Sequence, residues 1–382
     1  MEQVLHKLPD GWKYQKLKTL IKMHYGKALK AVDRIEGDVP VYGSNGVVGS
    51  HNEHLWSQPT VVIGRKGSVG EANLALTPSW TIDTAYYVEI INQDVLDLMY
   101  FYHFADRFDV SSISQKGVKP GINRNDYLNL SFPLPPLNEQ KRIVEKLDAL
   151  LTRIDTAIEH LQESVTLADA LSKNGVSEIF ECLKDSYEVA PLSSVVKINS
   201  GIALPKLFKN GFNDGDVPFF KVAQMNNHHE NMIEPEITFN ETVAKEHKVK
   251  LFPKGSTLIP KRGGAILTNK KRMLLEDASY DSNIMGLKAD EAKISDDYLF
   301  AFMRTIDLAN FVDASTIPQV NNKHIDQMQI SLASIDEQAD VVSRVNLLVK
   351  KVEKINSEIQ SQLDDLVALK NSILDSAFKG EL

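Results

Sequence analysis

PLPPLNEQKRIVEKLDALLTRI, residues 133–154, is the stretch of sequence that decides the fold. A proline-rich run ends at Pro136, and from Val144 onward apolar residues recur at steps of three and four. Proline stops a helix before it, and the 3–4 spacing gives the following helix one apolar stripe. The sequence therefore predicts a long amphipathic helix, with Asn138 as its N-cap and Glu139 in its first turn.

Residues 331–352, SLASIDEQADVVSRVNLLVKKV, repeat this stretch without a gap. Glu139 and Glu337 lie 198 positions apart (337 − 139), and the same offset relates the apolar residues that follow them. Asp336 is expected to cap the second helix as Asn138 caps the first. A repeat at a fixed offset indicates two copies of one structural unit.

The segments before the two helices resemble each other more loosely. Gly26 aligns with Gly201, residues 63–67 (IGRKG) align with 259–263 (IPKRG), and Asp83-Thr84 aligns with Asp281-Ser282. Short β-rich runs between turn residues predict strands at 60–63, 85–90 and 257–259, and short amphipathic helices are expected at 96–108 and 297–311. The predicted class is α+β, with heads at 1–136 and 185–334 and long helices at 137–184 and 335–382.

Each long helix carries an apolar seam with heptad spacing. The expected seam residues are Leu147, Leu151, Ile154, Ile158 and Leu161 in the first helix, and Leu348, Val352, Ile355, Ile359, Leu366 and Leu369 in the second, with Gln362 as a polar member. A helix of about 40 residues is about 60 Å long and cannot expose such a stripe to water. Intramolecular pairing as an antiparallel coiled coil, which makes a pseudo-two-fold repeat, is the favoured prediction; packing on the heads or homodimerisation remain alternatives.

The composition is that of a globular protein without a membrane segment or a disulfide framework. The chain has 382 residues, of which 43% are hydrophobic and 25% charged, and its only cysteine is Cys182. No stretch approaches the about 18 consecutive apolar residues that a membrane helix needs, and no apolar secretory leader begins the sequence. A cytoplasmic protein is expected. The formal net charge of −8 argues against a nucleic-acid partner unless cations are locally concentrated.

Local clusters of basic and amide side chains do occur, and several fall at matching places in the two heads. We predict DNA contacts from Arg65, Lys66, Lys116, Lys119, Asn123 and Arg124 in the first head, and from Lys221, Gln224, Lys261, Arg262, Lys270, Lys271, Arg272, Gln319, Asn321, Asn322 and Lys323 in the second. Arginine and lysine suit phosphates and guanine, and asparagine and glutamine suit adenine. The glycine-flanked turn 64–70 matches neither a Walker A loop nor a dinucleotide fingerprint, so a plain hairpin turn is its alternative interpretation.

No catalytic constellation is recognisable, and no histidine and cysteine spacing suits a metal ion. No residue of this chain is therefore predicted to be catalytic, to bind a metal or to bind a cofactor.

The run Pro135-Pro136-Leu137-Asn138-Glu139-Gln140, followed by Arg142-Ile143-Val144, resembles the junction between a target-recognition domain and a long helix in type I restriction–modification specificity subunits. Leu8-Pro9-Asp10-Gly11-Trp12 resembles the start of the same family. In the second copy Ala333-Ser334 replaces the prolines, but the register is kept.

The resemblance implies that each head is a target-recognition domain for one half of a split, asymmetric DNA target, and that the helix pair sets the spacing. Half-sites about one helical turn apart, roughly 34–36 Å, would suit that arrangement. The implied partners are double-stranded DNA, two modification subunits that carry S-adenosylmethionine and methylate adenine, and motor-nuclease restriction subunits. The alternatives are a coiled-coil scaffold that does not read DNA, and a single-chain nuclease–methylase.

Overall fold

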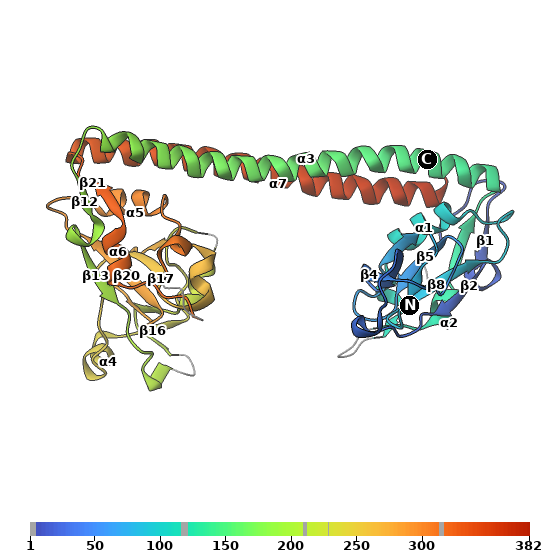
Figure 1. The fold of residues 1–382 in the computed structure, drawn as a ribbon, viewed down its shortest axis with the longest axis horizontal. Coiled ribbons are helices and arrows are strands. Elements are labelled where there is room, and N and C mark those ends of the chain that lie inside the picture. The colour runs from blue at the N-terminus through green and yellow to red at the C-terminus, as the bar shows by residue number, and fades with distance from the viewer. Residues whose placement is uncertain (1–4, 116–120, 209–211, 228, 313–316) are drawn as a thin grey trace. The chain divides into compact units, whose positions relative to one another are not determined.

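The computed structural model describes residues 5–115, 121–208, 212–227, 229–312 and 317–382 (Figure 1). Internal contacts divide the chain into two compact units, Met1–Gln162 with Gln360–Leu382, and Glu163–Ile359. Each unit contains one globular head and one portion of each long helix. We call the globular part of the first unit head 1 and that of the second unit head 2.

The main sheet of head 1 is antiparallel. Its strand order is β2 (Ile21–Tyr25), β8 (Ala85–Ile90), β5 (Thr60–Gly64), β6 (Ala72–Ala75). A second sheet holds β4 (Gly46–His51), β3 (Val39–Gly43) and β7 (Trp80–Thr81), and two pairs complete the head: β1 (Lys13–Lys16) with β11 (Ser131–Leu134), and β9 (Ser114–Gln115) with β10 (Gly121–Ile122). In β2, Ile21 and Met23 are buried while Lys22 is exposed, which is the alternation of a strand with one face on a core.

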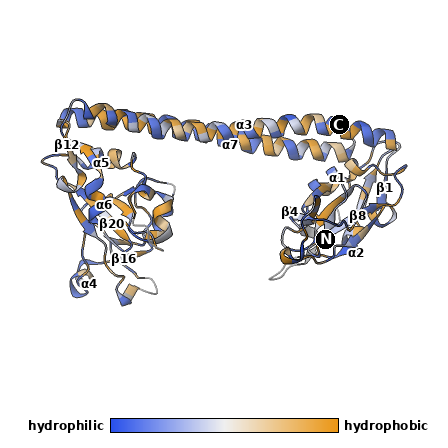
Figure 2. Ribbon diagram, in the orientation of Figure 1, coloured by the Kyte–Doolittle hydropathy of each residue, from blue (hydrophilic) through white to orange (hydrophobic). Residues whose placement is uncertain are grey.

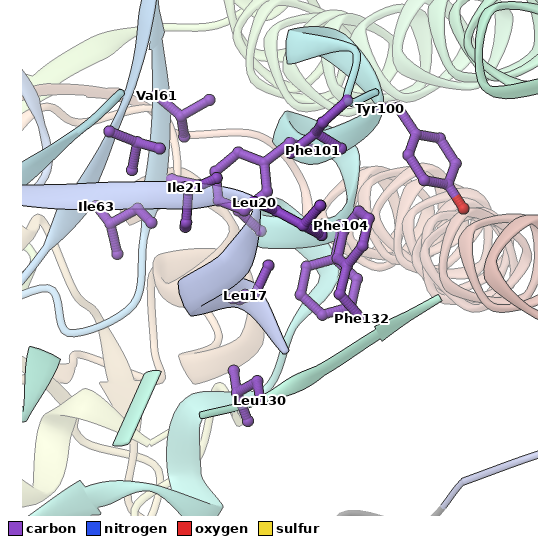
Figure 3. Close-up of a cluster of buried hydrophobic side chains, with 14 of the residues drawn as sticks. Leu17, Leu20, Ile21, Val61, Ile63, Tyr100, Phe101, Phe104, Leu130 and Phe132 are labelled. Atoms are coloured by element: carbon purple, nitrogen blue, oxygen red, sulfur yellow. The ribbon is translucent and has the colours of Figure 1, made fainter. Parts of the chain in front are cut away.

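Helix α1 (Leu98–Arg107) packs on this sheet and supplies the buried rings of Tyr100, Phe101 and Phe104 to the core of head 1 (Figure 3). Its N-cap Asp97 accepts hydrogen bonds from the backbone N–H groups of Met99 and Tyr100. Phe104 packs edge-on against Phe132 of β11, with ring centroids 4.8 Å apart, and both rings are almost fully buried. Such buried aromatic pairs fix where α1 sits on the sheet.

Head 2 repeats this layout. Its main sheet has the order β13 (Val196–Ser200), β20 (Ile284–Ala289), β17 (Thr257–Pro260), β18 (Arg272–Met273), and β12 (Val189–Pro191) pairs with β21 (Gln329–Ser331). Its second sheet is larger: β14 (Asn213–Asp214), β16 (Ile237–Phe239), β15 (Val217–Phe220) and β19 (Ser279–Tyr280), with α4 (Glu241–Glu246) beside it. The predicted internal repeat, the α+β class and the strands β5, β8 and β17 are confirmed.

The predicted helix over 297–311 is only partly correct. Helix α5 (Asp296–Met303) ends early, and a separate 3-10 turn follows at Leu308–Phe311. The break arises because the side chain of Asp307 accepts a hydrogen bond from the N–H of Ala309 and so caps the new turn. The corresponding prediction in head 1, 96–108, is confirmed by α1 to within two residues at its ends.

The two long helices are α3 (Leu137–Lys184) and α7 (Ile335–Lys379), and apolar residues recur along both (Figure 2). The predicted N-caps Asn138 and Asp336 are wrong, because each helix begins one residue earlier and places them in its first turn. The carbonyl of Pro136 accepts the first hydrogen bonds of α3, and the hydroxyl of Ser334 accepts one from the N–H of Glu337 at 3.3 Å.

Within each unit the two helices pack antiparallel, as predicted. In the first unit Arg142 of α3 donates to the carbonyl of Leu382, while Asp155, further along α3, accepts from Lys370 at 2.8 Å. In the second unit Asp169 accepts from Asn356, also at 2.8 Å. The helix ends also join the head cores: Leu147 and Phe378 in head 1, and Phe180, Val341 and Val345 in head 2. Pairing and packing on the heads therefore occur together.

The seam of α3 has the predicted members. In α7, every second seam position after Val352 lies one residue later than predicted. Leu147, Leu151, Ile154, Val352 and Ile359 are buried, and Ile158, Leu161, Leu348 and Leu366 are half-buried. Ile355 is instead 45% exposed and Leu369 48% exposed, and Gln362 also faces solvent. Two successive four-residue steps, from Leu348 to Val352 and on to Asn356, break the strict heptad, so Asn356, Leu363 and Lys370 turn inward in their place.

Two equivalent glutamines join each long helix to its head. Gln140 is fully buried; its Oε1 accepts from the N–H of Asp97, and its Nε2 donates to the carbonyls of Val95 and Pro135. Gln338 makes the same three bonds, to the N–H of Ser295 and the carbonyls of Lys293 and Ala333. The Glu-Gln signature at the start of each helix thus fixes how the helix leaves its head. Across the described residues, no helix is long and apolar enough to cross a membrane.

Candidate nucleic-acid interface

The basic turn of head 1 is the connection between β5 and β6, so the hairpin interpretation holds for its backbone. The N–H of Gly64 donates to Glu71, and that of Gly70 to Gly64, both at 2.8 Å. A Cβ on Gly64 would lie 1.9 Å from the carbonyl oxygen of Ser68, so this close turn admits only glycine there. The tightness of the turn places Arg65 and Lys66 at its start, with Lys66 exposed.

A second basic segment, distant in sequence, lies directly against this turn. Lys66 forms a β-bridge with Gly121, and the N–H of Ile122 donates to the carbonyl of Arg65 at 3.2 Å. Asn123 then caps helix α2 (Arg124–Leu128). Two clusters predicted separately from the sequence, Arg65 with Lys66 and Asn123 with Arg124, are therefore brought together. The predicted contacts Lys116 and Lys119 lie outside the described residues.

Tyr25, at the end of β2, organises the two arginines. The guanidinium carbons of Arg65 and Arg124 each lie 5.1 Å from the centroid of its ring, and that of Arg65 lies 5.9 Å from the ring of Tyr86. Arg65 also donates to the carbonyl of Asp83 at 3.0 Å. Among the described ion pairs neither arginine has a carboxylate partner, so both charges remain available to a ligand.

Head 2 carries the same arrangement at the equivalent place. Arg262 forms a β-bridge with Gln319, and the N–H of Val320 donates to the carbonyl of Lys261 at 3.0 Å. Helix α6 (Asn322–Gln327) follows, as α2 does in head 1. The predicted residues of this second locus are Lys261, Arg262, Gln319, Asn321, Asn322 and Lys323. In the described residues neither Lys261 nor Arg262 forms an ion pair.

The backbone bonds also fix which residues correspond between the heads. The N–H of Gly26 donates to Ala85 and that of Gly201 to Ile284, so the alignment of the two glycines is correct. It follows that Tyr25 corresponds to Ser200, whose hydroxyl accepts from the Nζ of Lys261 at 2.9 Å. The alignment of Asp83-Thr84 with Asp281-Ser282 is wrong by one residue, since Thr84 and Asn283 are the residues whose carbonyls accept from Arg65 and Lys261.

Two residues of head 2 that are predicted to contact DNA, Lys271 and Arg272, have buried side chains, which disfavours a contact with DNA. Lys271 is 8% exposed, and its ammonium donates to Asn269 Oδ1 and to the carbonyl of Ile306. Burial lowers the pKa of Lys271 to about 8. Arg272 is 6% exposed, and its guanidinium donates to Asn227 and to the carbonyl of Lys271. Both residues brace the loop that precedes β18.

Two other predicted contacts have intramolecular roles. The ammonium of Lys221 pairs with Glu236 at 2.8 Å, which neutralises its charge. The amide of Gln224 accepts from the N–H of Lys221 and donates to the carbonyl of Glu234, and so closes a 3-10 turn. Lys270 is half-buried beside the bracing pair. The candidate DNA-binding surface is thus narrowed to the two β-bridged turns and the segments bridged to them.

Tyr25 is the member of the head 1 locus that sequence reasoning missed. Its signal was present: the alignment of Gly26 with Gly201 places Tyr25 opposite Ser200 in an otherwise similar context. Only the fold shows that both arginines lie against its ring. Among the described residues no group of three or more histidine, cysteine, aspartate or glutamate side chains could hold a metal ion.

An α+β head with a basic turn, repeated after a long helix, defines a class of two-headed proteins. The chain belongs to the type I restriction modification DNA specificity domain family, whose model matches residues 9–167 and again 184–376. The two matches coincide with the two repeats described above.

Curated relatives share the full layout at low identity. The EcoDI type I restriction enzyme specificity subunit of Escherichia coli is 24% identical over 420 residues, covering 98% of this chain and 90% of its own. The StySPI specificity subunit of Salmonella potsdam is 22% identical over 424 residues, with the same coverages.

Solved structures show the same fold. A chain from a study of complex assembly and conformational transition in the type I R-M system matches with a TM-score of 0.75 and 17% identity, covering 99% of this chain and all of that chain. The HsdS subunit of Thermoanaerobacter tengcongensis matches with a TM-score of 0.54 and 19% identity, covering 99% of each.

Proposed function

We propose that this chain is the DNA-recognition subunit of a type I restriction–modification complex and that its two β-bridged basic turns contact the DNA. The observation that carries this proposal is the repetition of one locus, Arg65 with Lys66 and Lys261 with Arg262, each bridged to a second polar segment. Cations at equivalent places that form none of the described ion pairs suit a ligand with many phosphates, such as DNA.

The target is proposed to be split and asymmetric. The two loci share their backbone frame but differ in side chains, Tyr25 with Arg124 against Ser200 with Asn322. Because base edges are distinguished by the side chains that face them, two different loci select two different half-sites. The continuous helices α3 and α7 are proposed to set the gap between those half-sites.

The chemistry is proposed to lie in partner subunits. Modification subunits that carry S-adenosylmethionine would methylate adenine, with two copies per recognition subunit, and motor-nuclease subunits would join for restriction, all in the cytoplasm. Leu167 and Leu171, which are 69% and 66% exposed on α3, support docking of a partner on the helices, since the described residues leave both side chains largely uncovered. The scaffold alternative shares this feature but leaves the repeated basic turns without a role.

The test is charge reversal in the assembled complex, Arg65→Glu together with Lys261→Glu. Affinity for the target duplex is expected to fall about tenfold or more, and the salt dependence of binding to become shallower. The matched control is Lys350→Glu with Lys351→Glu, two exposed lysines of α7 that give the same change in net charge. Equal DNA affinity of the Arg65/Lys261 variant and the wild type would refute the proposed surface.

A further inference from the structure

Head 1 holds two guanidinium groups against one exposed aromatic ring, an arrangement that the described residues of head 2 do not show. Tyr25 is 51% exposed, and Arg65 and Arg124, which are 59 positions apart in the chain, both lie 5.1 Å from its centroid. We infer that Tyr25 is a positioning residue that aims these arginines at guanine in the half-site of head 1. This inference rests on the proposed function and adds a base class to it.

Apart from the contact with the Tyr25 ring, the described backbone holds each arginine side chain through one hydrogen bond. Among described contacts, Arg65 donates to the carbonyl of Asp83, and Arg124 to that of Met23 at 3.4 Å. A guanidinium has five N–H donors, so most of them remain for a ligand. Contact with the rings of Tyr25 and, for Arg65, Tyr86 restrains the side chains before DNA arrives, which lowers the entropy lost on binding.

Guanine is the base that this chemistry selects. Its O6 and N7 accept two parallel hydrogen bonds in the major groove, and the arginine fork matches them. A phosphate can also accept a guanidinium fork, but a phosphate contact does not require one, because the point charge of a lysine binds it as well. At the equivalent place head 2 has Lys261 bonded to Ser200, a point charge for which the described residues show no cation–π contact. The ring therefore distinguishes the two pre-oriented arginines of head 1 from the lysine at the equivalent place in head 2.

The experiment uses the purified complex of the full chain with its modification subunits, and duplexes of its mapped target. Guanines in each half-site are replaced by 7-deazaguanine, which removes the N7 acceptor and leaves the phosphates unchanged. For the wild type, replacement in one half-site is expected to weaken binding about tenfold. In Tyr25→Ser, which installs the residue of head 2, that penalty is expected to fall below about twofold.

Two further variants test the same inference independently of Tyr25→Ser. Tyr25→Phe keeps the ring and removes the hydroxyl. It is expected to retain part of the affinity loss caused by 7-deazaguanine, because the ring and not the hydroxyl positions the arginines. Arg65→Lys keeps the charge but removes the fork, and is expected to abolish most of the penalty even if Tyr25→Ser does not fold. The other half-site serves as the internal control, because its guanines are not read by Arg65 or Arg124.

Failure of this inference and failure of the proposed function give different results. A penalty that persists in full in Tyr25→Ser and Arg65→Lys overturns the inference, as does a target in which no guanine replacement affects binding. Loss of affinity that is equal on natural and substituted duplexes identifies phosphate contacts only and also overturns it. A wild-type complex that binds target and scrambled duplexes equally refutes the proposed function itself, a result recognisable before any variant is made.

Discussion

Gln140 and Gln338 lie 198 positions apart (338 − 140) and make the same three hydrogen bonds. Each accepts one from the backbone N–H at the start of a head helix, Asp97 or Ser295, at 2.8 Å. Each also donates to two backbone carbonyls, Val95 and Pro135 or Lys293 and Ala333. This pair shows that the repeat extends to single atoms and that the junction of head and helix is built identically twice.

Gln140→Ala is expected to lower the free energy of unfolding by about 2–4 kcal/mol, because one backbone N–H and two backbone carbonyls lose their bonds to the fully buried amide. Gln362→Ala, at an exposed position of α7, is the control and should change stability by less than about 0.5 kcal/mol. Urea unfolding followed by circular dichroism measures both. Equal stabilities of the two variants would mean that water replaces the amide at the junction.

The shifted seam of α7 makes a second prediction. Ile359→Ala removes a side chain that is 8% exposed and should cost about 2–4 kcal/mol, whereas Ile355→Ala, at a position 45% exposed, should cost less than about 1 kcal/mol. A strict heptad would make the two losses equal. Thermal unfolding of the matched pair decides between the two registers.

Lys271 makes the stability of head 2 depend on pH. Its pKa is lowered to about 8 in the folded state, so between pH 8 and its unfolded value of 10.5 the unfolded chain binds more protons. Stability from this group therefore rises with pH across that window, by up to about 3 kcal/mol. Thermal unfolding of the wild type and Lys271→Met at pH 7.5 and 9.5 measures the difference.

The stability of the wild type relative to Lys271→Met should be greater at pH 9.5 than at pH 7.5. A constant difference between the two proteins would contradict the burial of the ammonium. DNA affinity of Lys271→Met in the complex provides an independent check, because a residue that braces a loop from inside should not alter the salt dependence of binding.

The proposed role of the helices in setting the half-site gap predicts that a longer helix pair changes the target. Insertion of seven residues after Ile158 in α3 and seven after Asp365 in α7 keeps the heptad and adds about 10.5 Å to each helix. The gap in the methylated motif should then grow by about 3 base pairs, at about 3.4 Å each. Sequencing of modified bases measures it. An active variant with an unchanged gap would remove the helices from that role.

The repeat and the long helices were predictable because helical periodicity and a fixed offset survive in the sequence. The seam beyond Val352 was not, because a one-residue shift in a coiled coil leaves Ile355 and Leu369 as apolar as true seam residues. Burial of Lys271 and Arg272 was also invisible, since their partners Ile306 and Asn227 are more than 30 residues away in sequence. Conversely, Arg65 and Arg124 were each singled out, but only the β-bridge of Lys66 with Gly121 shows why they belong together.

We propose above all that this chain determines which DNA sequence a modification complex recognises. The most direct measurement is a map of modified bases across the genome of a cell that expresses the modification subunit, with and without the gene for this chain. Deletion is expected to erase adenine methylation at one split, asymmetric motif, and a plasmid copy of the gene should restore it. An unchanged map in the deletion strain would contradict the account.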